Sequence, residues 1–269
     1  MNIDDIKKQI KKYGKTVYIA EKGTPIQKKF DPIKKELNLL LPGPTPISIF
    51  EKPLSLIGTV SHQLAGEEWP SIEGKFCMPL LQITKDLPIF QKLFGLENQL
   101  ITIYFPQEAV YLEKENRWAI NIKEYVISEA ERMIKVTIPK GVPQEKMIHV
   151  IKWKKTIEYP SSDLFELFYP QELIESIKQI EEIYGSDFYE ENFPTSERTK
   201  IGGYPFCIQS EPHRWLSRPL KADHNVLDWE FILQISQDDF EKLRLVDQGI
   251  MAIFHHKHTK EWVGELQYF

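Results

Sequence analysis

The chain has 269 residues, of which 42% are hydrophobic and 27% are charged, and its formal net charge is −5. A chain of this length and composition can bury a large core, so it is not of the intrinsically disordered class. We expect no membrane-spanning helix, because no apolar run reaches about 18 residues. We expect no signal peptide either, since acids stand where its basic region would be. The acidic balance also argues against non-specific nucleic-acid binding, which needs a strongly basic face.

Two cysteines, Cys77 and Cys207, each lie within an apolar run of the sequence. Two thiols do not make a disulfide framework in a chain of this length, and no CxxC pair is present. Free cysteine behaves as a small hydrophobic residue, so we expect both side chains to be buried and unreactive. These features predict a reducing, cytoplasmic compartment.

Residues 1–54 are expected to form an extension that packs on the core. Isoleucines recur every three or four positions between residues 3 and 13, and Gly14 follows them, which predicts a short helix. Four prolines between residues 41 and 53 predict an extended loop, because proline fixes the backbone and removes amide donors. The main domain is expected to span residues 55–269.

Strands dominate this main domain. Nine short segments are apolar or alternate with period two, and most are rich in β-branched and aromatic residues. These segments are residues 79–83, 100–105, 117–122, 135–138, 150–156, 206–209, 231–235, 250–254 and 265–269.

The strongest helical pattern lies at residues 170–184, with Pro170 at its start and Gly185 after its end. Its apolar stripe is expected to consist of Leu173, Ile174, Ile177, Ile180, Ile183 and Tyr184. Residues 186–200 are polar and predict a loop.

Two parts of the chain resemble each other. Each has an apolar strand with one glutamine, Gln82 or Gln234, followed by a hydroxyl residue, an acid and a short helix. Two weak copies are too few for a solenoid. We therefore expect an α+β fold, a β-rich single domain made of two interleaved pseudo-repeats with a few short helices. The repeats are expected at about residues 55–160 and 200–269, joined by a linker helix at 170–184.

The second half of the chain also resembles the YwqG-like family, bacterial proteins of unknown function. The resemblance rests on residues 200–205, 208–210, 233–235, 238–239, 247–249 and 265–268. The first half matches more loosely, through residues 68–70 and 80–83. Where the family usually has a Trp-Gly pair, this chain has Leu245-Val246, and its first half lacks the family's paired glycines.

The family motif holds a set of candidate ligand-pocket residues. They are Gly202, Gly203, Tyr204, Pro205, Gln209, Gln82, Gln234, Asp238, Asp247 and Gly249. The glycine pair predicts either an anion-binding nest of amides or a close approach of backbone to a neighbouring strand. The strand glutamines predict either hydrogen bonds that tie the repeats together or a polar ligand cavity.

Two further clusters carry weaker signals. Asp238, Asp239 and Asp247 suit either acid–base chemistry or capping and turn formation, and the second interpretation is favoured. His256 and His258 would share one face of a strand, but zinc needs three or four ligands, so a strand end at the surface is the preferred interpretation. We expect no metal, no cofactor and no catalytic residue set.

Residues 163–197 hold ten acidic residues and one basic residue, Lys178. Such a stretch is either a solvated face or a surface that steers a basic partner. The candidate partner-binding residues are Glu181, Glu182, Asp187, Glu190 and Glu191.

The family that this chain resembles looks like one found near secreted toxin genes. This resemblance favours a non-catalytic, cytoplasmic immunity-type protein. It would neutralise a toxin with a basic cleft by steric and electrostatic occlusion, without a nucleic-acid or membrane partner. The alternative is a small-ligand binder or enzyme that uses a polar pocket near Gly203, Gln209, Gln234 and Asp247.

Overall fold

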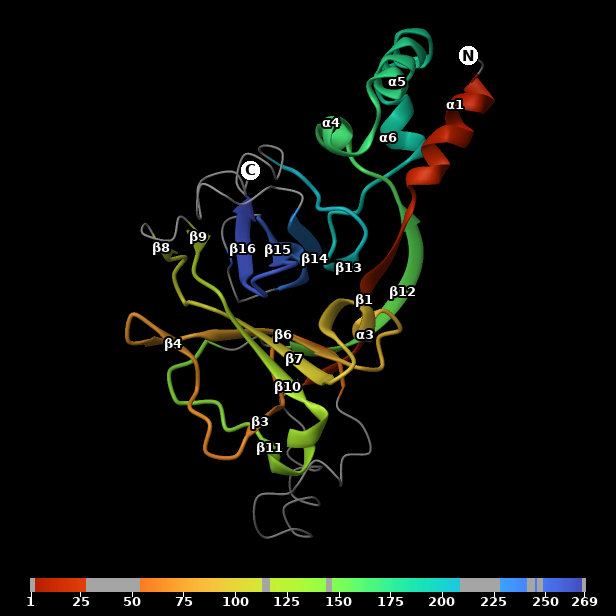
Figure 1. Ribbon diagram of the computed structural model, residues 1–269. Coiled ribbons are helices and arrows are strands. Elements are labelled where there is room, and N and C mark those ends of the chain that lie inside the picture. Colours follow the sequence, from red (N-terminus) through yellow and green to blue (C-terminus); the bar gives the residue numbers. More distant parts are fainter. Residues whose placement is uncertain are drawn as a thin grey trace.

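The computed structural model describes residues 3–27, 54–112, 117–143, 147–208, 228–240, 245 and 249–267. Its centre is a 12-stranded antiparallel sheet with strand order β10-β7-β6-β2-β12-β1-β13-β14-β15-β16-β9-β8 (Figure 1). The order is nearly symmetric about the central pair, β12 (Met147–Glu158) and β1 (Lys15–Gln27), with corresponding strands at matching places on the two sides. Four strands of repeat one lie on one side of this pair, and four strands of repeat two lie on the other.

The strands of repeat one are β2 (Leu56–Ile57), β6 (Met78–Thr84), β7 (Asn98–Phe105) and β10 (Asn121–Val126). Those of repeat two are β13 (Lys200–Gly202), β14 (Trp229–Ser236), β15 (Ile250–His256) and β16 (Trp262–Gln267). Two small sheets pair β3 (His62–Leu64) with β11 (Met133–Lys135) and β4 (Ser71–Ile72) with β5 (Lys75–Phe76).

The two repeats agree in the hydrogen bonds of their strand glutamines. The Gln82 side chain accepts from Ser61 N (2.8 Å) and donates to Leu54 O (2.8 Å). The Gln234 side chain accepts from Phe206 N (2.8 Å) and donates to Arg198 O (3.1 Å). Each glutamine therefore holds the main chain on both sides of the short strand that pairs with its own.

The repeats also agree in register and in their hydroxyl contacts. The β6–β7 pairing shifts between Pro79 and Leu81, and the β14–β15 pairing shifts between Phe231 and Leu233. The hydroxyl of Ser55 accepts from Thr84 N (3.2 Å). At the corresponding place in repeat two, the hydroxyl of Thr199 accepts from Ser236 N (3.0 Å). The predicted pair of pseudo-repeats is confirmed.

The repeats are interleaved through β1 and β12. β1 precedes repeat one but pairs with β13 of repeat two, through Tyr18 opposite Ile201. β12 lies within the range expected for repeat one, but it precedes the strands of repeat two as β1 precedes those of repeat one. It pairs with β2 of repeat one, through Val150 opposite Leu56. The two long strands also pair with each other along almost their whole length (Figure 1). Neither half can therefore form its sheet without a strand from the other.

One core serves both repeats. Its largest cluster joins residues of β6 and β14 that occupy equivalent positions in the two repeats. These are Leu80, Leu81 and Ile83 in repeat one, and Ile232, Leu233 and Ile235 in repeat two, all nearly or fully buried. The helix α3 (Phe90–Phe94) packs on this cluster through Phe90 and Phe94.

A second cluster joins the helices at one end of the molecule (Figure 1). The helices are α1 (Ile3–Ile10), α4 (Phe165–Phe168), α5 (Gln171–Tyr184) and α6 (Phe188–Asn192). Short 3-10 helices span Lys11–Tyr13, Ile127–Arg132, Ser162–Leu164 and Gln237–Asp239. The predicted helices at residues 3–13 and 170–184 are confirmed, and Ile6 and Ile10 of α1 share the cluster with the buried stripe of α5.

The stripe of α5 is shorter than predicted. Its buried residues end at Ile180, and Ile183 and Tyr184 are 73% and 61% exposed. The loop predicted at residues 186–200 is also partly wrong, because it contains α6. Tyr189 anchors this helix, since its hydroxyl is buried and donates to Pro160 O (2.8 Å).

Three predicted strands are wrong in detail. Of residues 135–138, only Lys135 lies in a strand, at the end of β11, and residues 136–138 are irregular. Residues 206–208 are not a strand, because Gly202 and Gly203 both have positive φ and turn the chain away from the sheet. The segment 117–122 is divided. Its first two residues form β9 (Arg117–Trp118), which with β8 (Tyr111–Leu112) extends the sheet beyond β16, and its last two begin β10 beside β7.

Replacing either strand glutamine by leucine should destabilise the protein. Gln82→Leu and Gln234→Leu each leave a partly buried main-chain N–H and C=O without their side-chain partner. The loss of such a bond costs up to roughly 1–3 kcal/mol per group, less where water can replace the partner. Urea denaturation of each variant measures the loss in the free energy of unfolding. The exposed helical residue Gln179 provides the control, and losses no larger than that of Gln179→Leu would contradict the bridging role.

Candidate functional site

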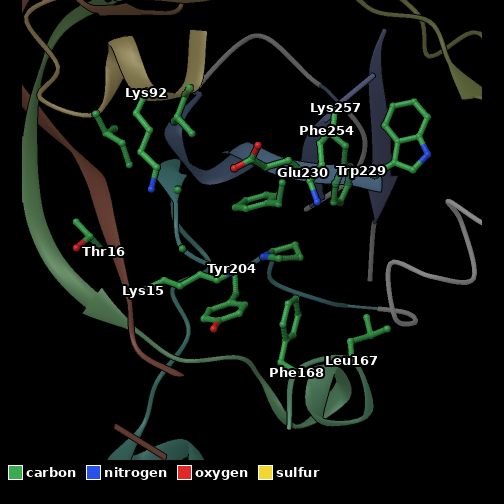
Figure 2. Close-up of a pocket in the computed structure, with 16 residues that line it drawn as sticks. Lys15, Thr16, Lys92, Leu167, Phe168, Tyr204, Trp229, Glu230, Phe254 and Lys257 are labelled. Atoms are coloured by element: carbon green, nitrogen blue, oxygen red, sulfur yellow. The ribbon is translucent and has the colours of Figure 1, made fainter. Parts of the chain in front are cut away.

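A cavity of about 540 Å³ lies between strands of the large sheet and the helices α3 and α4. Its walls come from β1, α3, α4 and the glycine turn after β13, and from β14 and β15 of repeat two. Figure 2 shows Lys92 extending into it from α3, with Leu167 and Phe168 of α4 on the opposite side. The cavity thus joins segments that are far apart in the sequence.

Four charged side chains line this cavity. Three are the lysines Lys15, Lys92 and Lys257, and the fourth is Glu230, which faces the cavity in Figure 2. All four residues are exposed to solvent in part, so a dissolved molecule can reach them. Three ammonium groups against one carboxylate make the cavity electropositive, in a chain whose net charge is −5.

Lys15 has the most distinctive surroundings. Its Nζ lies over the ring of Tyr204, 4.2 Å from the centroid, and over the ring of Phe168 at 4.8 Å. Partial burial lowers the pKa of Lys15, Glu230 raises it, and the positive charges of Lys257 and Lys92 lower it further. The net direction is downward, which favours the neutral amine.

The rest of the lining is mainly apolar. Phe231 and Phe254 lie with their ring centroids 5.7 Å apart, and Ile89, Leu93 and Leu167 complete much of the wall. Cavities that bind small molecules commonly combine such apolar walls with a few polar groups.

A buried ion pair lies behind the wall of the cavity. Glu158 and Lys200 are 2% and 0% exposed, and Lys200 Nζ donates to the Glu158 carboxylate at 2.7 Å. Burial lowers the pKa of Lys200 to about 8, although the Glu158 charge raises it. The Glu158 carboxylate also accepts from Ser196 N (2.6 Å) and Tyr204 N (3.1 Å).

This carboxylate explains the glycine pair. A Cβ on Gly203 would collide with Glu158 and lie 3.0 Å from Val17 Cβ, and one on Gly202 would lie 3.0 Å from Thr16 O. The two sequence interpretations therefore meet in one structure. The turn approaches its neighbours closely, and one of its amides holds an anion that belongs to the protein itself.

The structure brings only part of the family motif to the cavity. Gly202, Gly203, Tyr204 and Pro205 line it. Gln82 and Gln234 are fully buried elsewhere and bind main chain. The exposed Asp238 accepts from Lys22 Nζ through its main-chain oxygen (3.3 Å), and Gly249 O accepts from Gln237 N (2.9 Å). Gln209 and Asp247 lie outside the described residues.

The other candidates have structural partners. Asp239 is nearly buried, accepts from Thr199 N (3.2 Å) and lies 3.7 Å from Lys22 Nζ. Nδ1 of His256 accepts from Thr259 N (3.0 Å) in the turn between β15 and β16. Within the described part of the chain, no group of three or more His, Cys, Asp or Glu side chains is placed to hold a metal ion.

The acidic candidates lie on and around the end of α5 and on α6. Glu182, Asp187, Glu190 and Glu191 are exposed, and Glu181 is partly buried. Partial burial raises the pKa of Glu181, a hydrogen bond from Tyr189 N lowers it, and the charges of Glu190 and Asp187 raise it. These carboxylates therefore interact as one negative region.

Sequence reasoning missed the charged residues of the cavity, which are Lys15, Lys92, Glu230 and Lys257. In the sequence, each of these residues lies among ordinary charged surface residues and belongs to no motif. Only the fold brings the four side chains together.

Breaking the buried ion pair should destabilise the fold. Glu158→Gln leaves the Lys200 ammonium buried without a counter-charge, which costs about 3–5 kcal/mol. Chemical denaturation measures this loss, and the double variant Glu158→Gln with Lys200→Met should regain part of it. A single variant as stable as the native protein would contradict the assignment of this pair.

Comparison with protein families gives one match. A family model described as a domain of unknown function, DUF1963, matches residues 65–259, a range that includes both glutamine strands. No curated protein matches the chain. Among the helices of the described residues, none is both long enough and apolar enough to cross a membrane.

Proposed function

This chain belongs to the DUF1963 family, a domain of unknown function, and we propose from its cavity that it binds a small anionic molecule with an aromatic or apolar part. The observation that carries the proposal is the convergence of Lys15, Lys92 and Lys257 on one cavity with aromatic walls. An anion gains from the three ammonium groups, and its apolar part gains from burial against the rings.

The size of the cavity supports this proposal. Its volume of about 540 Å³ falls within the range of sites for small molecules, roughly 300–1,000 Å³. Glu230 adds one acceptor, which would favour a ligand that also carries a hydrogen-bond donor. The function would be binding, with selectivity set by charge and shape.

Removing cavity lysines should weaken the binding of an aromatic anion. We expect 1-naphthyl phosphate to bind the native protein and uncharged 1-naphthol to bind more weakly. The double variant Lys92→Ala with Lys257→Ala should lose about tenfold in affinity or more, because each lost charge contact is worth on the order of 1 kcal/mol. Isothermal calorimetry measures all three affinities.

Lys178 on α5 is exposed and outside the cavity, so Lys178→Ala is the matched control. Equal binding of the phosphate and the alcohol, or equal loss in the control, would contradict an anion site in the cavity.

A second candidate function is an immunity-type protein that covers a basic toxin. The observation that favours it is the pair of exposed apolar side chains, Ile183 and Tyr184, among the carboxylates of α5 and α6. Protein interfaces combine such an apolar centre with a charged rim. Its acidic residues would steer a partner with a basic cleft, and the body of the domain would occlude that cleft.

Charge reversal tests this candidate. Changing Glu181, Glu182, Asp187, Glu190 and Glu191 to lysine should slow association with a protein that co-purifies with the native chain from its source cell, most strongly at low salt. Surface plasmon resonance measures the association rate. An association rate that the five changes leave unaltered would contradict a role for the acidic region in binding.

Two narrower proposals concern the family and the cellular compartment. We propose that the chain is related to the bacterial YwqG-like proteins, and the motif around Gly202 and Gly203 supports this proposal. The two buried thiols, Cys77 and Cys207, favour a reducing, cytoplasmic compartment.

A further inference from the structure

The Lys15 amine occupies a place in the cavity that neither Lys92 nor Lys257 shares. It lies over the faces of two rings, Tyr204 and Phe168, which exclude water from one side of the nitrogen. These ring faces attract the ammonium form, so the lowered pKa of Lys15 comes first from its partial burial. The residue is otherwise exposed, so a dissolved molecule can approach from the open side. An amine that is partly desolvated yet accessible is the arrangement that makes a lysine nucleophilic.

The charges around Lys15 act in both senses. Lys257 and Lys92 are cationic neighbours that disfavour a third ammonium group in the same space, whereas the Glu230 carboxylate favours it. Partial burial, together with the two cationic neighbours, lowers the pKa of Lys15. A larger share of this amine is therefore neutral at neutral pH than of an ordinary surface lysine.

We infer that Lys15 is a covalent anchor, whose amine forms a Schiff base with an aldehyde or ketone that carries an anionic group. This inference rests on the proposed function, because the anionic group would be held by Lys92 and Lys257 in the same cavity. Their charges would both orient the ligand and keep the Lys15 amine reactive.

The reaction balances without a further reagent. The nitrogen lone pair of Lys15 adds to the carbonyl carbon, an N–C bond forms, and the carbonyl oxygen takes up a proton. Loss of that oxygen as water then breaks the C–O bond and leaves a C=N bond. The two protons of the neutral amine leave with that water, so nothing is oxidised or reduced, and Glu230, which lines the same cavity, would relay them.

Two other lysines among the described residues lack these features. Lys200 has a lowered pKa, but it is fully buried and donates to Glu158, so no dissolved carbonyl compound reaches it. Lys178 is an exposed residue on α5, outside the cavity.

Pyridoxal 5′-phosphate is a suitable probe for the whole chain, because it combines an aldehyde, an aromatic ring and a phosphate. After incubation at neutral pH and reduction with borohydride, peptide mass spectrometry locates the labelled lysines. We expect Lys15 to be labelled several-fold faster than an exposed surface lysine such as Lys178, because a lowered pKa raises the neutral fraction of the amine. Pyridoxal, which lacks the phosphate, should label Lys15 much more slowly.

Variants separate the amine from the charge. Lys15→Arg keeps the cation and should abolish the fast label, whereas Lys178→Arg should leave it unchanged. Lys92→Ala retains Lys15 and should slow its labelling. Labels spread evenly over surface lysines, or a fast label that survives in Lys15→Arg, would overturn the inference.

Pyridoxine 5′-phosphate, which has an alcohol in place of the aldehyde, separates this inference from the proposed function. If it binds and slows the label on Lys15, both stand. If it binds in the cavity while pyridoxal 5′-phosphate leaves Lys15 unlabelled, the covalent step is wrong and anion binding stands. If Lys15 is labelled equally fast by pyridoxal and its phosphate, and no phosphate binds, the anion site is wrong and this inference falls with it.

Discussion

The antiparallel pairing of β1 with β12 is the constraint on which the rest of the structure depends. Each strand comes from the segment that precedes one repeat and also pairs with the other repeat, so the ladder joins two otherwise similar halves. At its end Lys15 lies opposite Glu158. One of these two residues reaches the cavity, and the other forms the buried ion pair behind the cavity wall.

Burying Glu158 and Lys200 is costly, because both charges leave water, and the structure offsets this cost with three donors to one carboxylate. These donors draw the chain around Glu158, and the turn fits only because Gly203 has no side chain there. The wall of the cavity is therefore a consequence of the ion pair. Its shape should be rigid on the side of Tyr204, whose amide is one of the donors.

Much of the repeat architecture was predictable, because a glutamine inside an apolar strand is a conspicuous signal and occurs twice. The helix α5 was predictable from its apolar stripe, although Ile183 and Tyr184 at the end of that stripe are exposed. The strand β1 was not predicted, because charged residues such as Lys15, Glu21 and Lys22 interrupt its apolar pattern and only tertiary pairing decides its state. The cavity was hidden for a related reason. Its lysines come from β1, α3 and the end of β15, and no local pattern links them.

The central claim is that the two halves form one cooperative body through exchanged strands. Native-state hydrogen exchange tests it most directly, because it measures an opening free energy for each amide. The account predicts that amides of β6–β7 and of β14–β15 share one opening free energy with those of the β1–β12 ladder. Exchange of one half at a clearly lower free energy, while the other half and the ladder stay protected, would contradict it.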